Sequence, residues 1–149
     1  MSDTELVITR IFDAPRAMVY QAFVDPDQLA QWFGPAGWSV PRDSIEIDVR
    51  PGGYQRFTMV NDADPSMRSP VSATFTEAVE NELLVGEEPD TFIPEFAGRG
   101  MRLRLEFYDE EGGRTRLVLR QGPYTPDFAE GAGEGWASSF AKLDKVLSA

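Results

Sequence analysis

The 149-residue sequence contains no histidine and no cysteine, so any acid–base or nucleophilic chemistry must come from other side chains. Histidine is the usual general base and metal ligand near neutral pH, and cysteine supplies thiolate nucleophiles and zinc ligands. A catalyst built from this chain would need a buried carboxylate with a raised pKa, a tyrosine, or a water molecule held between polar side chains. We expect no metal site and no cofactor.

Eight polar residues are candidates for chemistry in such a site: Arg56, Glu77, Arg104, Glu106, Tyr108, Arg120, Gln121 and Tyr124. Arg104 and Glu106 alternate with apolar neighbours, which is typical of the solvated face of a strand with cross-strand charge pairs. Gln121 is in phase with Leu117 and Leu119, and we therefore expect it to point inward near one end of the molecule.

The segment 77–95 carries seven acidic residues and no basic one. An uninterrupted acidic run of this kind is most simply a solvated edge, which repels neighbouring sheets and protects an exposed strand. Docking of a basic partner surface is the alternative interpretation.

Aromatic residues gather in DPDQLAQWFGPAGW (25–38), where a surface loop would normally carry small polar residues. We expect Trp32, Phe33 and Trp38 to form one wall or lid of a cavity that also touches Ala132. The full set predicted to line this cavity is Trp32, Phe33, Trp38, Phe57, Met59, Phe75, Met101, Leu103, Gln121, Phe128, Trp136 and Phe140. Plain core packing is the alternative for each aromatic residue.

The predicted elements that position these residues begin with a strand at 6–12. A helix follows after Pro15, and Asp13 or a neighbour would cap this helix. Asp25 and Pro26 start a second short helix. Alternating segments then predict strands at 45–49, 54–60, 71–79, 83–86, 101–109 and 115–121. Finally, Trp136, Phe140, Leu143 and Leu147 form one stripe of a long terminal helix.

This order of elements predicts a single α+β domain over residues 1–149, with a curved antiparallel sheet of about six or seven strands. The terminal helix is the element long enough to cover the apolar face of that sheet. A bent sheet gripping a helix leaves space between them, which the segment 25–38 would close at one end.

The chain carries several spaced motifs: IFDAPR (11–16), DP (25–26) followed by Leu29, WFGP (32–35), DVRPGG (48–53) and GW (135–136) followed by Phe140 and Leu143. Together they resemble the Aha1 C-terminal-domain-like (activator of Hsp90 ATPase homologue-like) branch of the START/Bet v 1-like SRPBCC superfamily. The resemblance implies a helix-grip fold with a hydrophobic cavity. Relatives include carriers of apolar molecules, polyketide cyclases and aromatases, and an Hsp90 co-chaperone that uses a further N-terminal domain not present in this sequence.

Twenty-five acidic and fourteen basic residues give a formal net charge of −11. Nucleic acids and anionic membranes are poor partners for such a surface, because binding them relies on basic side chains. No apolar run approaches the roughly 20 residues that span a bilayer, and the first ten residues lack a signal-peptide pattern. We expect a cytoplasmic protein that does not insert into membranes.

Three functions fit these observations. The first is binding or sequestration of a small apolar or amphipathic molecule in the cavity, and the missing histidine favours it over the second, a cyclase- or hydrolase-type enzyme using the same cavity. The third is an Hsp90-related protein-interaction domain with a chaperone partner. A cavity of roughly 300 Å³ or more with few polar groups would favour binding, whereas a buried carboxylate with a strongly raised pKa would favour the enzyme.

Overall fold

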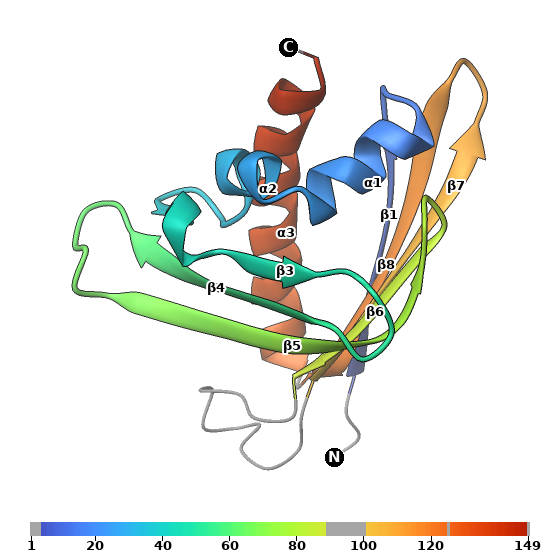
Figure 1. Cartoon of the computed structure of the whole chain (residues 1–149). Helices are drawn as coiled ribbons and strands as arrows, with labels where there is room; N and C mark the ends of the chain where they lie inside the picture. Colours follow the sequence, from blue (N-terminus) through green and yellow to red (C-terminus); the bar gives the residue numbers. More distant parts are fainter. Residues whose placement is uncertain (1–3, 89–100, 125, 149) are drawn as a thin grey trace.

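The computed structural model describes residues 4–88, 101–124 and 126–148, and it consists of a strongly curved antiparallel sheet, two short helices and one long helix (Figure 1). The helices are α1 (Arg16–Val24), α2 (Pro26–Trp32), the 3₁₀ helix η1 (Arg42–Ser44) and α3 (Pro126–Leu147). The strands are β1 (Thr4–Phe12), β2 (Trp38–Ser39), β3 (Glu46–Asp48), β4 (Tyr54–Asn61), β5 (Arg68–Val79), β6 (Leu83–Glu88), β7 (Met101–Glu110) and β8 (Arg114–Tyr124). The predicted α+β helix-grip fold is confirmed.

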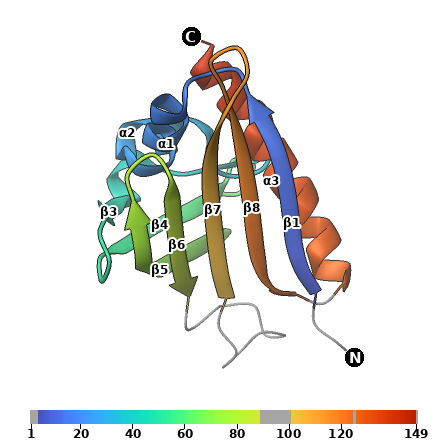
Figure 2. The same ribbon diagram turned by 90° about the vertical axis from the view of Figure 1, so that its right-hand side faces the viewer.

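The strands follow the order β1-β8-β7-β6-β5-β4-β2, and β3 pairs with the same edge of β4 as β2, further along that strand. The first and last strands are therefore neighbours, and Figure 2 shows β6, β7, β8 and β1 side by side with α3 next to β1. The sheet has eight strands rather than six or seven because the two-residue β2 joins the predicted set, whereas β3 falls within the strand predicted at 45–49.

The register places the concave-face residues of neighbouring strands opposite one another. Leu103 lies opposite Gln121 on one side and Gly86 on the other, and Glu88 lies opposite Met101. Directly opposed residues point to the same face of a sheet. These five residues therefore lie on the same face of the sheet, the concave face that α3 covers.

The two short helices differ in how they begin. The carboxylate of Asp25 accepts a hydrogen bond from the Asp27 N–H over 3.0 Å, so α2 has the predicted acidic cap followed by proline. In α1, Pro15 is itself the N-cap residue and no side chain caps the helix. The predicted capping by Asp13 is therefore wrong, because Pro15 lies just outside the first turn.

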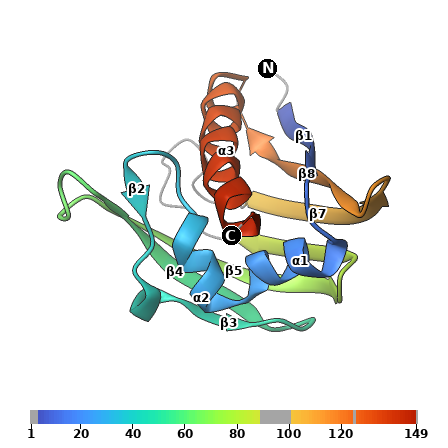
Figure 3. The same cartoon turned by 90° about the horizontal axis from the view of Figure 1, so that it is seen from above.

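Figure 3 shows the sheet curving around α3. The core lies between the concave face of the sheet and the apolar stripe of α3, and buried residues of α1 and α2 join it. Phe140, Leu143 and Leu147 are buried, and the ring of Phe140 meets that of Phe12 edge to face with centroids 5.3 Å apart. Trp136, one turn earlier, is only half-buried. Within the described residues, no helix combines the length and the apolar character that crossing a membrane would require.

Candidate functional site

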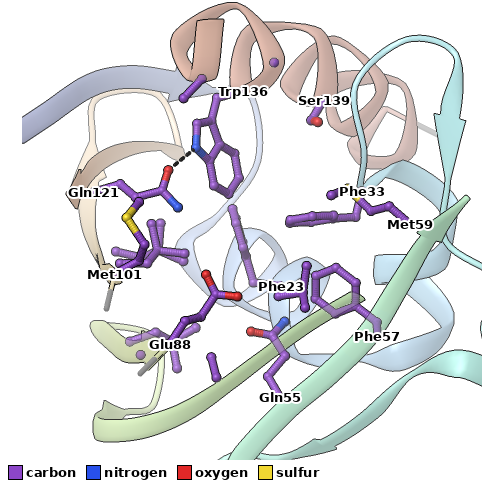
Figure 4. Close-up of a pocket in the computed structure, with 18 of the residues that line it drawn as sticks. Phe23, Phe33, Gln55, Phe57, Met59, Glu88, Met101, Gln121, Trp136 and Ser139 are labelled. Carbon is purple, nitrogen blue, oxygen red and sulfur yellow. Dashed lines mark hydrogen bonds between the residues drawn. The ribbon is translucent and has the colours of Figure 1, made fainter. Parts of the chain in front are cut away.

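A cavity of about 260 Å³ lies between the concave face of the sheet, α3 and the segment that follows α2 (Figure 4). Its volume is slightly below the roughly 300 Å³ at which the range for small-molecule sites begins. The described residues of the lining are mostly apolar, with neutral polar groups from Gln55, Ser69, Gln121 and Ser139, and one ionisable side chain, Glu88.

Strand alternation supplies the apolar wall of this cavity. Every second residue of a strand points to the same face, so the strands that cross the concave face contribute their inward positions. These are Phe57 and Met59 of β4, Val71, Ala73 and Phe75 of β5, Leu84 and Gly86 of β6, and Met101, Leu103 and Leu105 of β7.

Aromatic rings form one end of the cavity. Phe33, directly after α2, meets Phe57 edge to face with centroids 4.8 Å apart and meets Trp136 of α3 with centroids 5.6 Å apart. Such edge-to-face pairs are a favoured arrangement of aromatic rings. Phe33 thus connects the sheet wall to the helix wall.

The loop between α2 and β2 is held against α3 by hydrogen bonds. The Ala36 N–H donates to Ser138 Oγ over 2.6 Å, and Lys142 Nζ donates to the carbonyl oxygens of Trp38 and Pro35 over 2.9 and 3.3 Å. Burial lowers the pKa of Lys142, while the charge of Asp62 acts in the opposite direction. The loop therefore has a fixed position beside the cavity.

Eight of the predicted cavity residues line the cavity in the structure. They are Phe33, Phe57, Met59, Phe75, Met101, Leu103, Gln121 and Trp136, and the predicted neighbour Ala132 lines it as well. The side chain of Phe128 lies outside the described residues.

The structure places Trp32, Trp38 and Phe140 away from the cavity lining. Trp32 is 0% exposed, packs edge to face against Phe23, and donates its indole N–H to the carbonyl oxygen of Ala22 over 2.9 Å. Its ring therefore joins α1 to α2 in the core instead of forming a lid. Trp38 is half-buried in β2, and Phe140 is enclosed by other core rings.

Gln121 lies on the concave face as its phase with Leu117 and Leu119 predicted. Its Oε1 accepts a hydrogen bond from Trp136 Nε1 over 2.8 Å, which orients both side chains at the cavity wall. Gln55 also lines the cavity, although the sequence analysis did not select it. Gln55, Phe57 and Met59 are alternate residues of one strand and point to the same face, and this spacing could have identified Gln55.

Glu88 is the main site residue that sequence reasoning missed. The acidic run was interpreted as a solvated edge, and exposed Glu77 and Glu87 fit that interpretation, since both lie beside Arg102. Glu88 points the other way, into the cavity (Figure 4). Burial raises the pKa of the Glu88 carboxyl, and a hydrogen bond from the Ser72 backbone acts in the opposite direction.

Residues 13–148 match the family described as activator of Hsp90 ATPase homolog 1-like protein. Three solved structures share the fold: a protein from Nitrosomonas europaea (24% identity, 99% of this chain and 96% of that one, TM-score 0.82), one from Chromobacterium violaceum (22%, 97% and 97%, 0.84) and the AHSA1 protein from Silicibacter pomeroyi (25%, 97% and 98%, 0.79). No curated protein matches the sequence significantly.

Proposed function

The chain belongs to the activator of Hsp90 ATPase homolog 1-like family, and we propose that it uses the family fold to bind a small apolar or amphipathic molecule. The observation that carries the proposal is the largely apolar cavity of about 260 Å³ between the sheet and α3. Transfer of apolar ligand surface from water into such a space is favourable. The aromatic rings and the methionines would adapt to the ligand's shape.

Neutral polar groups at the cavity wall support an amphipathic rather than a purely apolar ligand. Gln55, Gln121 and Ser139 come from β4, β8 and α3, so hydrogen-bonding atoms face the space from several sides. A few polar groups in an apolar pocket typically fix the orientation of a ligand.

A cyclase- or hydrolase-type reaction in the same cavity is the second candidate, and Glu88 is the observation that favours it. A carboxyl whose pKa is raised by burial is the form of general acid or base that a chain without histidine could use. Binding is the better-supported function because it involves the whole apolar lining, whereas catalysis would involve chiefly one residue. The family name also keeps a chaperone partner as an alternative.

A cavity-filling variant tests the proposal. A Cβ atom placed on Gly86 would meet Ala73 Cβ at 3.7 Å and the Thr74 carbonyl oxygen at 3.8 Å, which are ordinary contacts. Gly86→Leu should therefore fold and place its side chain in the cavity. Thr74→Leu adds the same side chain at an exposed position and is the matched control.

Calorimetry with 4-phenylbutan-1-ol, a neutral amphipathic probe, gives the readout. We expect the unmodified protein and Thr74→Leu to bind it with affinities within a factor of about two, and Gly86→Leu to bind at least about tenfold more weakly. Native mass spectrometry of protein purified from its own source would then identify a retained molecule. Equal binding by Gly86→Leu, or none by the unmodified protein, would contradict a role for this cavity.

A further inference from the structure

We propose that the ligand of this cavity is an amphipathic amine, whose protonated nitrogen lies against Glu88 and whose apolar body lies against the aromatic end. This inference rests on the proposed binding function and specifies the chemical class of the ligand. It is carried by the position of one carboxylate within an otherwise uncharged lining.

The backbone directs Glu88 into the cavity. Leu84, Gly86 and Glu88 occupy alternate positions of β6, and all three line the cavity. Glu88 also lies opposite Met101 of β7, which faces the same space. Figure 4 shows its carboxyl group pointing inward between Met101 and Gln55.

Among the described residues that line the cavity, Glu88 has the only ionisable side chain. The nearby arginines of β7 face the outer side of the sheet, where Arg102 lies 3.9 Å from both Glu77 and Glu87 and Arg104 pairs with Glu106. In the part of the chain that the structure describes, none of the ion pairs includes Glu88. The part of the cavity wall that the structure describes thus presents a single carboxyl group.

A carboxylate in mostly apolar surroundings is costly unless it is hydrogen-bonded or paired with a cation. The Ser72 backbone supplies one hydrogen bond to Glu88, which leaves further acceptor positions on the two oxygens. An ammonium group would supply charge-assisted hydrogen bonds and neutralise the charge. An anionic ligand would add repulsion at the same place.

The opposite end of the cavity fits an apolar or aromatic ligand body. Phe33 meets both Phe57 and Trp136 edge to face there, and none of these three side chains is charged. The surface as a whole carries a formal net charge of −11, which raises the local concentration of cations and requires a control for non-specific attraction.

Three probes with one phenylbutyl body separate these chemistries: 4-phenylbutylamine, 4-phenylbutan-1-ol and 5-phenylpentanoate. At pH 7.5 the amine is protonated, like a lysine side chain with a pKa of about 10.4. We expect calorimetry on the unmodified protein to give the amine an affinity at least about tenfold higher than the alcohol. We expect the carboxylate to bind most weakly.

Two variants with the same change in net charge identify the source of the preference. Glu88→Gln keeps the size of the side chain and an acceptor for the Ser72 N–H. In this variant the affinities for the amine and the alcohol should lie within about threefold of each other. The affinity for the alcohol should change by less than about threefold from that of the unmodified protein. Glu87→Gln removes the neighbouring charge on the exposed face and should retain the full preference. Circular dichroism melts establish that both variants are folded.

The outcomes distinguish this inference from the proposed function. If amine and alcohol bind the unmodified protein equally, or if the preference survives in Glu88→Gln, the amine assignment is overturned while cavity binding stands. Loss of the preference in Glu87→Gln would overturn it too, because surface charge would then be the cause. If none of the three probes binds, the proposed function fails and the inference fails with it.

Discussion

The indole Nε1 of Trp136 donates a hydrogen bond to Oε1 of Gln121 over 2.8 Å, and this contact joins α3 to β8 at the wall of the cavity. Both side chains line the cavity and are half-buried. The pair therefore connects the packing of the helix on the sheet to the shape of the site.

The first prediction concerns the energy of this contact. Gln121→Leu leaves the indole N–H without its partner, and we expect a loss of about 1–3 kcal/mol in the free energy of unfolding. Trp136→Phe removes the donor, and the double variant should be less destabilised than the sum of the two single variants by about 0.5–1.5 kcal/mol. Urea denaturation of all four proteins measures this coupling. Strict additivity would show that the hydrogen bond makes no net contribution.

The second prediction tests how α3 is held on the sheet. Phe140 is 0% exposed and packs against Phe12 and Trp32, so Phe140→Ala should lower the free energy of unfolding by about 3–5 kcal/mol. Lys145→Ala, at an exposed position of the same helix, should change it by less than about 0.5 kcal/mol. A loss below half a kcal/mol for Phe140→Ala in denaturant melts is incompatible with this packing.

The fold was largely predictable because its elements carry strong local patterns. Alternation in residues 101–109 and 115–121 predicted β7 and β8, and the stripe containing Phe140 and Leu143 predicted α3. Alternation at 45–49 likewise predicted β3, whereas the two-residue β2 is too short for a pattern, and pairing with β4 defines it. The cap of α1 was mispredicted because Asp13 and Pro15 both fit the start of a helix.

The candidate site was predictable where parity decided the direction of a side chain. Gln121 lines the cavity as its phase with Leu119 indicated, whereas Glu88 was grouped with Glu87 by charge although the two point to opposite faces of β6. Trp32 and Phe33 are neighbours at the end of α2, and tertiary packing decides which ring reaches the cavity. The carbonyl oxygen of Ala22 in α1 holds the Trp32 indole in the core, a contact that no local pattern encodes.

The third prediction concerns the loop beside the cavity. Lys142→Met removes the donor to the carbonyl oxygens of Trp38 and Pro35, so we expect a loss of about 1–2 kcal/mol in unfolding free energy. The loop amides, including that of Ala36, should also exchange with solvent faster in hydrogen–deuterium exchange. Lys145→Met makes the same change at an exposed position of α3 and should leave this exchange unaltered. Unchanged exchange in Lys142→Met would show that the Ser138 contact alone holds the loop.

The last prediction follows from the direction in which burial shifts the pKa of Glu88. In the unfolded chain a glutamate carboxyl titrates near pH 4.3, and in the folded chain the pKa of Glu88 lies above its ordinary value. Between these two pKa values the folded state binds the proton more tightly than the unfolded state. The stability that Glu88 contributes is therefore fully present below about pH 4.3 and is lost as the pH rises through the folded-state pKa.

Glu88→Gln stays neutral at every pH and escapes this loss. Its unfolding free energy relative to the unmodified protein should therefore increase from pH 4.5 to pH 8, in urea denaturation measured without any ligand. Glu87→Gln, on the exposed face beside Arg102, keeps the buried carboxyl intact and should show no comparable gain at pH 8. A difference between Glu88→Gln and the unmodified protein that is constant across this range, or smaller at pH 8, would mean that the cavity does not disfavour the ionised carboxylate. Adding 4-phenylbutylamine at pH 8 should then stabilise the unmodified protein more than Glu88→Gln, because stabilisation of the folded state by a ligand increases with the logarithm of its affinity.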